Sequence, residues 1–100
     1  MAKIKTLERK RFSILTTDLT HCYICGKPKQ HLHEIFYGRN RKNSMIYGCV
    51  VPLCYEHHEG NNGVHHNPTL NEELRKKCQK QFIKEYPNLE FISIFYENYL

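Results

Sequence analysis

The sequence contains no run of about 18 apolar residues, which is the length that a transmembrane helix needs. Its basic start, MAKIKTLERKRFSILTT, also lacks the apolar segment of a secretory signal. Internal repeats and low-complexity segments are absent as well. We therefore expect no membrane partner and a reducing cytoplasmic compartment, in which cysteines do not form lasting disulfides.

The chain is also short, and its 100 residues suffice for one small domain with a modest core. A metal ion would help to stabilise such a domain. There are five cysteines, an odd number at uneven spacings, which favours metal ligands or core residues over disulfides. The formal net charge of +5, with the histidines counted as neutral, favours an anionic partner, most simply nucleic acid.

Four residues form a candidate zinc site. Cys22 and Cys25 are separated by two residues, and Gly26 then permits a turn that lets both thiolates face one ion. Cys54 and His57 repeat this spacing further along the chain. Three cysteines and one histidine complete a tetrahedral shell that is closed to water, so we predict a structural Zn²⁺. The alternative is that Cys54 is a core residue and the first pair binds no metal.

A second group of ligand-type residues remains once His57 is assigned to zinc: His33, Glu34, His58 and His65. A zinc ion shared between the two halves would bring the segments around His33 and His58 together. Such a cluster suits a second, open site, where a divalent ion holds a scissile phosphate and a neighbouring base activates water. The alternative is that these side chains only form hydrogen bonds with loop carbonyls.

Alternating apolar residues predict short strands at residues 11–16 and 32–37, and residues 45–54 are mostly apolar. A regular second strand would place His33 and Glu34 on opposite faces, so both could reach one ion only if the strand bends or ends there. Residues 38–44 are interpreted as a polar, basic loop.

The clearest helical period covers residues 71–86, with an apolar stripe that includes Leu74, Cys78 and Phe82. Thr69 or Asn71 is expected to cap this helix. A short packing helix should follow near the C-terminus, although a strand is an alternative. Cys49 and Cys78 lie in apolar segments and are expected in the core.

The stretches HEIFYG, NRKNS, YGCVVPLCYEHH and GVHHN together resemble the HNH (ββα-metal) endonuclease superfamily, most closely its small phage and prophage members. The resemblance covers about residues 20–86. It implies an α+β fold in which two short strands and a helix form a zinc-braced finger, with an added C-terminal helix. The single domain then divides into a basic arm and strand (1–20), zinc knuckles with the ββα core (21–67) and a helical C-terminal part (68–100).

The resemblance also implies an activity, the metal-dependent hydrolysis of DNA phosphodiester bonds in phage or prophage DNA processing, in the cytoplasm of a bacterial host. His33, His58 and His65 match the family's ligands of a catalytic divalent metal, Mg²⁺, Mn²⁺ or another ion. Glu34 stands where the family has its general-base histidine, which is a departure. Either Glu34 is the base, or His33 is the base and Glu34 binds the metal with His58 and His65, or the site is inactive.

Basic residues follow the predicted active strand and lie in the first knuckle, where they would contact DNA phosphates: Arg39, Arg41, Lys42, Lys27 and Lys29. One finger holds one active site, so nicking is expected, and cutting both strands would need a homodimer. Two other interpretations stay open. One is a zinc-stabilised nucleic-acid-binding module without catalysis, and the other is a protein-interaction module that uses residues 91–99 as a dimer face.

Overall fold

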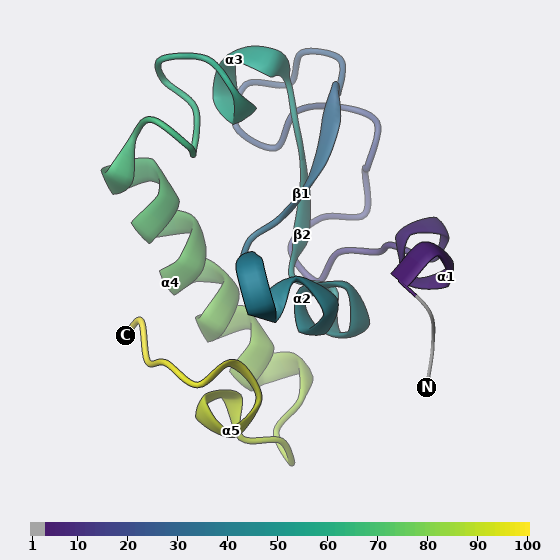
Figure 1. Ribbon diagram of the computed structural model, residues 1–100, viewed down its shortest axis with the longest axis vertical. Coiled ribbons are helices and arrows are strands. Elements are labelled where there is room, and N and C mark those ends of the chain that lie inside the picture. Colours follow the sequence, from purple (N-terminus) through teal and green to yellow (C-terminus); the bar gives the residue numbers. More distant parts are fainter. Residues whose placement is uncertain (1–3) are drawn as a thin grey trace.

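The computed structural model describes residues 4–100, and Figure 1 shows a short two-stranded sheet with helices around it. The elements in order are α1 (Ile4–Arg9), β1 (His31–Glu34), a 3₁₀ turn (Gly38–Asn40), α2 (Arg41–Tyr47), β2 (Val50–Leu53), α3 (Tyr55–His58), α4 (Pro68–Glu85) and α5 (Phe91–Phe95). This small mixed architecture agrees with the predicted α+β class. Within residues 4–100, every helix is too short or too polar to cross a membrane.

The sheet is an antiparallel pair of strands in which His33 lies opposite Val51 and Glu34 opposite Val50. All of β2 is buried. The first strand is shorter than the prediction, which ran to residue 37. After Ile35, the backbone of Phe36 turns away from β2 and bonds instead with the side chain of Ser44, whose hydroxyl donates to the Phe36 carbonyl over 2.6 Å.

The polar segment at residues 38–44 was predicted to be a loop. It forms instead the 3₁₀ turn and most of α2. Its polar side chains bind distant backbone. Asn40 donates to the carbonyl of Phe95 over 3.0 Å, and Asn43 donates to that of Ile94 over 3.1 Å. Residues that look like solvated loop in the sequence therefore attach α2 to α5.

The N-terminal part also differs from the prediction. Residues 4–9 of the predicted basic arm form the helix α1, and Lys3 of that arm lies outside the described residues. No strand forms at residues 11–16. Instead, the Ser13 hydroxyl accepts hydrogen bonds from the backbone amides of Leu15 and Thr16, which bends the chain.

The long helix α4 is present as predicted, and its stripe of Leu74, Cys78 and Phe82 is buried. Its N-cap, however, is neither Thr69 nor Asn71. Asn67 caps the helix, because its side chain accepts a hydrogen bond from the Leu70 amide and Pro68 occupies the first turn.

The predicted C-terminal packing helix is α5, which lies against α4 (Figure 1). Phe91 and Phe95 are its buried residues. Their rings meet Phe82 of α4 at centroid distances of 5.3 and 6.0 Å and Phe36 at 5.3 and 4.7 Å. This aromatic core holds α4 and α5 beside the residues that follow β1. The ligand-type side chains lie on and around the sheet and α3, and Cys22 and Cys54 are themselves part of the buried core.

Candidate metal centres

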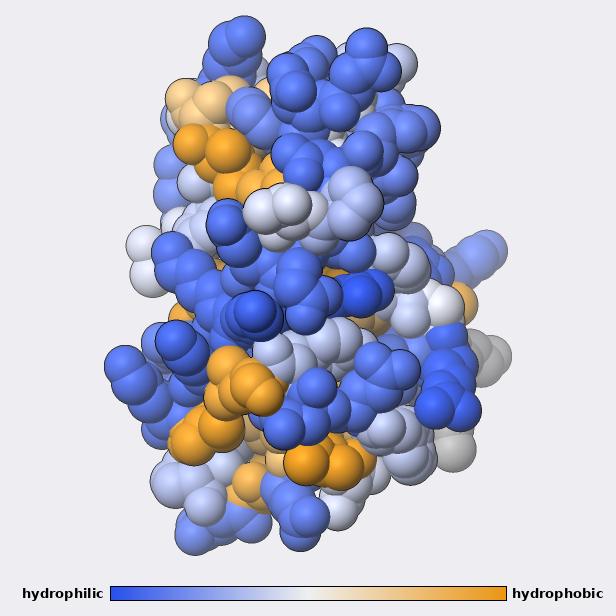
Figure 2. Space-filling model, turned by 90° about the vertical axis from the view of Figure 1, so that its left-hand side faces the viewer, coloured by the Kyte–Doolittle hydropathy of each residue, from blue (hydrophilic) through white to orange (hydrophobic). Residues whose placement is uncertain are grey.

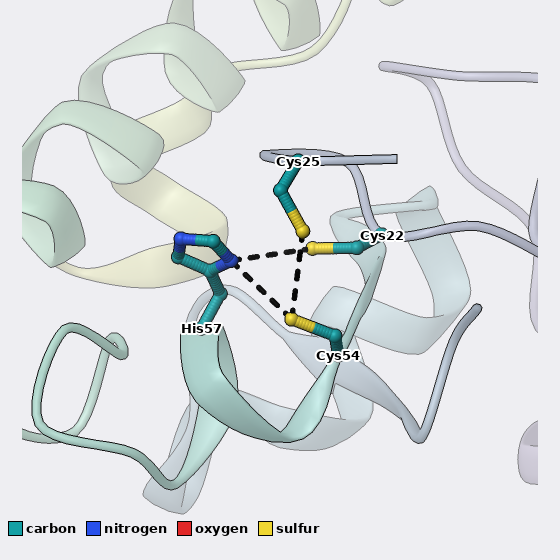
Figure 3. A group of neighbouring side chains, drawn as sticks. All are labelled: Cys22, Cys25, Cys54 and His57. Atoms are coloured by element: carbon teal, nitrogen blue, oxygen red, sulfur yellow. Dashed lines mark hydrogen bonds between the residues drawn. The ribbon is translucent and has the colours of Figure 1, made fainter. Parts of the chain in front are cut away.

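The predicted zinc ligands converge. One ligand atom from each of Cys22, Cys25, Cys54 and His57 lies within 4.8 Å of the others, and Figure 3 shows the four side chains pointing toward one another. The His57 Nδ1 atom lies 3.7 Å from the Cys22 sulfur and 3.3 Å from the Cys54 sulfur. The Cys25 and Cys54 sulfurs are 3.6 Å apart. A tetrahedral zinc shell separates such atoms by about 3.6–3.8 Å, so the cluster can hold a metal such as zinc.

Local backbone geometry explains how the first two ligands face inward. The Cys22 amide donates to the Lys27 carbonyl over 2.7 Å, and the Gly26 amide donates to the Cys22 carbonyl over 2.9 Å. Gly26 has a φ of 79°, in the left-handed region that glycine adopts without strain. The Tyr23 amide donates to the Pro52 carbonyl of β2. The knuckle is thus fixed to the strand that leads directly to Cys54.

The electrostatics of the knuckle favour a metal ligand at Cys22. Burial opposes ionisation of this thiol, but the backbone amides of Cys54, Cys25 and Ile24 outweigh it and lower the pKa of Cys22 to about 6. At neutral pH this side chain is therefore mostly thiolate, the form that binds zinc. The other two cysteines, Cys49 and Cys78, are fully buried in the core as expected.

A second cluster lies beside the first. Ligand atoms of His33 on β1, His58 on α3 and His65 in the following turn lie within 4.8 Å of one another. The Nε2 atoms of His58 and His65 are 3.2 Å apart. The His33 ring centroid lies 5.3 Å from that of His58 and 5.4 Å from that of His65. The structure therefore brings together the three histidines that the sequence assigned to a second metal.

The state of His33 suits a metal ligand. Burial and then the neighbouring His58, His65 and Arg75 charges lower the pKa of His33 to about 3. The imidazole is therefore neutral at physiological pH, as metal binding requires. Its Nε2 atom is buried and has no hydrogen-bond partner among the described residues, and a buried polar atom of that kind normally has one.

His58 has a similar environment. Burial is the main cause that lowers its pKa, followed by His65 and His31. The Nδ1 atom of His58 lies 3.2 Å from a Glu59 carboxylate oxygen, but this contact lacks the alignment of a hydrogen bond. A carboxylate on the far nitrogen of a ligating histidine is a common arrangement around metals.

Glu34 does not join this cluster. Strand β1 is regular through Glu34, so its side chain leaves the sheet on the face opposite His33. The Glu34 carboxylate lies 2.6 Å from Arg11 and 3.3 Å from Arg41. The alternative in which Glu34 binds the metal with His58 and His65 is therefore wrong for this geometry. The pairing of Arg11 with Glu34 has no signal in the sequence, because no local pattern links residues 23 positions apart.

Two more histidines lie near the cluster but outside its ligand set. His31, on the same face of β1 as His33, is exposed, and its ring centroid is 4.6 Å from that of His58. His66 is exposed. Arg75, whose charge acts on His33, was not among the predicted site residues, because the helical pattern around it carries no functional signal.

The predicted DNA-contact residues do not share one environment. Lys27 and Lys29 are exposed in the knuckle, and Lys42 is half-buried on α2. The Arg39 guanidinium lies over the Tyr96 ring, 5.1 Å from its centroid. Arg41 contacts both Glu34 and Glu8, so carboxylates already neutralise it.

Comparison with known proteins adds no relative. No family model, no curated protein and no solved structure matches this chain.

Proposed function

We propose that the protein is a metal-dependent DNA endonuclease of the HNH type that hydrolyses phosphodiester bonds. Its structural zinc is held by the Cys₃His cluster, and a catalytic divalent ion is held by His33, His58 and His65. The observation that carries the proposal is the convergence of three histidines, one with a buried, unpartnered nitrogen, next to a closed four-ligand site.

The number of ligands in each cluster supports a different role for each. Four protein ligands complete the tetrahedral shell of a structural zinc, whereas three leave a position open to solvent or substrate. When bound, a divalent ion at the open site supplies positive charge to the phosphate and the leaving oxygen. Histidine binds a metal through its uncharged imidazole, so the three side chains would hold the ion without cancelling that charge.

Three residues near the site are candidates for the general base of the reaction. His33 is one of the converging ligands, and Glu34 is engaged by two arginines. His31 is the exposed imidazole beside His58, and imidazole is the side chain best suited to take a proton from water near neutral pH. We assign the role of general base to His31, with Glu34 as the alternative.

The surface is compatible with a polyanionic substrate. Figure 2 shows that the side of the molecule along α4 is mostly hydrophilic, with separated hydrophobic patches. The net charge is +5, and the exposed lysines Lys27 and Lys29 lie in the knuckle next to β2. Contacts between these lysines and phosphates would favour binding to the DNA backbone and make that binding sensitive to salt.

The test is conversion of supercoiled plasmid to open circle by zinc-loaded protein with Mg²⁺, Mn²⁺ or Ni²⁺ added. We expect nicking by the native protein and by His66→Ala, and none by His58→Ala or His65→Ala. The neighbouring His66 is a matched control, because it is exposed and outside the cluster. Metal analysis should give two ions per chain for the native protein and for His66→Ala, and one for His65→Ala.

The same assay identifies the base. Loss of nicking in His31→Gln with retention in Glu34→Gln supports His31, and the reverse pattern returns the role to Glu34. Retention of full nicking by His65→Ala would contradict the three-histidine site.

A second candidate function is a zinc-stabilised nucleic-acid-binding module without catalysis. The observation that favours it is the pairing of Glu34, at the position of the family's base, with Arg11 and Arg41. DNA binding by correctly metallated protein, with no nicking under any of the three metals, would support this function instead.

A further inference from the structure

Within residues 4–100, one arginine beside the three-histidine cluster has no acidic partner. Arg75 lies on α4, and its guanidinium carbon is 5.1 Å from the Tyr37 ring centroid and 5.3 Å from the Tyr99 ring centroid. The two rings hold the planar guanidinium between them. Asn71, one turn earlier on the same helix, donates a hydrogen bond to the Tyr37 hydroxyl over 3.1 Å, which fixes one of these rings.

The polar atoms of this group are not satisfied. In the part of the chain that the structure describes, the Nε atom of Arg75 is buried without a hydrogen-bond partner, and so is the side-chain oxygen of Asn71. Among residues 4–100, no carboxylate lies within the 4.0 Å of an ion pair with Arg75, whereas Arg11 and Arg41 both contact Glu34. A half-buried guanidinium is normally paired, because its charge is costly to remove from water.

The position of Arg75 relates it to the second cluster. Its Tyr37 neighbour lies 6.0 Å from the His33 ring and 5.7 Å from the His65 ring, centroid to centroid. The Arg75 charge is also one of the causes, after burial, His58 and His65, that lower the pKa of His33. The unpaired cation and the three histidines therefore belong to one local surface.

We propose that Arg75 binds a phosphate oxygen of the DNA backbone next to the three-histidine site. This assignment rests on the proposed function, since it places the phosphate between a bound divalent ion and the guanidinium. A guanidinium offers a planar fork of donors that matches phosphate oxygens. Tyr37 and Tyr99 orient that fork, and Asn71 holds Tyr37 in place.

The test compares Arg75→Gln with Lys80→Gln. Both variants remove one positive charge from α4, and Lys80 is exposed. We expect Arg75→Gln to reduce the single-turnover nicking rate by about 100-fold or more, as for loss of a donor to a developing negative charge, and Lys80→Gln to leave it within about twofold. The slope of log Kd for DNA against log salt should fall by about 0.9 in Arg75→Gln only.

A direct measurement separates this proposal from a structural role for Arg75. Inorganic phosphate is titrated into metallated protein with ¹⁵N-labelled arginine, and the Arg75 Nε–H signal is followed. We expect this signal to shift more than that of Arg11, which is paired with Glu34, and Arg75→Lys to recover part of the salt slope but not the nicking rate.

The outcomes also separate this proposal from the proposed nuclease function. If the native protein does not nick DNA, the nuclease function fails, but the salt slope and the phosphate titration still test Arg75. If Arg75→Gln matches Lys80→Gln in salt slope and phosphate leaves the Arg75 signal in place, Arg75 is not a phosphate ligand. Melting curves and zinc content check that each variant is folded.

Discussion

Replacement of Cys25 by alanine distinguishes a zinc site from a chance group of thiols. Cys25 is exposed, whereas Cys22 and Cys54 are buried. Without a metal, an exposed substitution changes the free energy of unfolding by about 0.5 kcal/mol or less. With zinc bound, the same substitution removes one of four ligands from a shell whose other members come from distant parts of the chain.

The size of the expected effect follows from linkage. A ligand that binds only the folded state adds about 4 kcal/mol to the free energy of unfolding when its free concentration is a thousand times its Kd. For a domain of about 100 residues, 1 kcal/mol corresponds to roughly 4–8 °C in melting temperature. We therefore expect Cys25→Ala, or a strong chelator, to lower the melting temperature of the zinc-loaded protein by about 16–32 °C.

The assay is thermal melting by circular dichroism with matched zinc, with and without chelator. Ile24→Ala is the control, because Ile24 lies in the same turn and is also exposed. Cobalt substitution adds a spectroscopic measurement, since thiolate-to-cobalt absorption should weaken in Cys25→Ala and not in Ile24→Ala. If Cys25→Ala has the same melting temperature as Ile24→Ala, and the chelator leaves the native melting temperature unchanged, the cluster is not a zinc site.

Three further substitutions test the fold. Phe82→Ala should lower the free energy of unfolding by about 3–5 kcal/mol in urea titration, because it empties a fully buried site ringed by aromatic side chains; a loss below about 1 kcal/mol would contradict this packing. Asn67→Ala should cost about 1 kcal/mol through loss of the α4 cap, and an unchanged urea midpoint would show that the cap is dispensable. Glu34→Gln should cost about 1.5–3 kcal/mol, since Arg11 and Arg41 lose a charged acceptor. In Arg11→Gln, where one of these contacts is already absent, the same change should cost less.

The grouping of the ligand-type side chains was the part of the structure that the sequence predicted best, for a local reason. A two-residue gap between ligands directs both side chains to one ion, so Cys22, Cys25, Cys54 and His57 could be assigned from spacing alone. Strand alternation likewise predicted that Glu34 would face away from His33, and the structure confirms it. What spacing could not give is the identity of the partners that Glu34 finds instead.

The helix α2 was missed because the interactions that form it are long-range. Asn40 and Asn43 look like loop residues, yet they bind the carbonyls of Phe95 and Ile94 more than 50 positions away. Ser44 acts over only eight positions, where its hydroxyl satisfies the backbone of Phe36. A single sequence gives no signal for such pairings. Polar residues whose side chains bond with backbone inside the protein are therefore predicted to lie on the surface.

The two clusters are coupled through one turn of helix. His57 and His58 are adjacent in α3, and adjacent helical residues point about 100° apart, so a ligand fixed at His57 also sets the direction of His58. The Val64 amide donates to the His57 carbonyl over 2.9 Å, which returns the chain and places His65 beside His58. A Cβ at Gly63 would lie 2.8 Å from the backbone of both His57 and His58, so this turn of the chain needs glycine. The closed site therefore orients two of the three ligands of the open one, although the two clusters share no ligand.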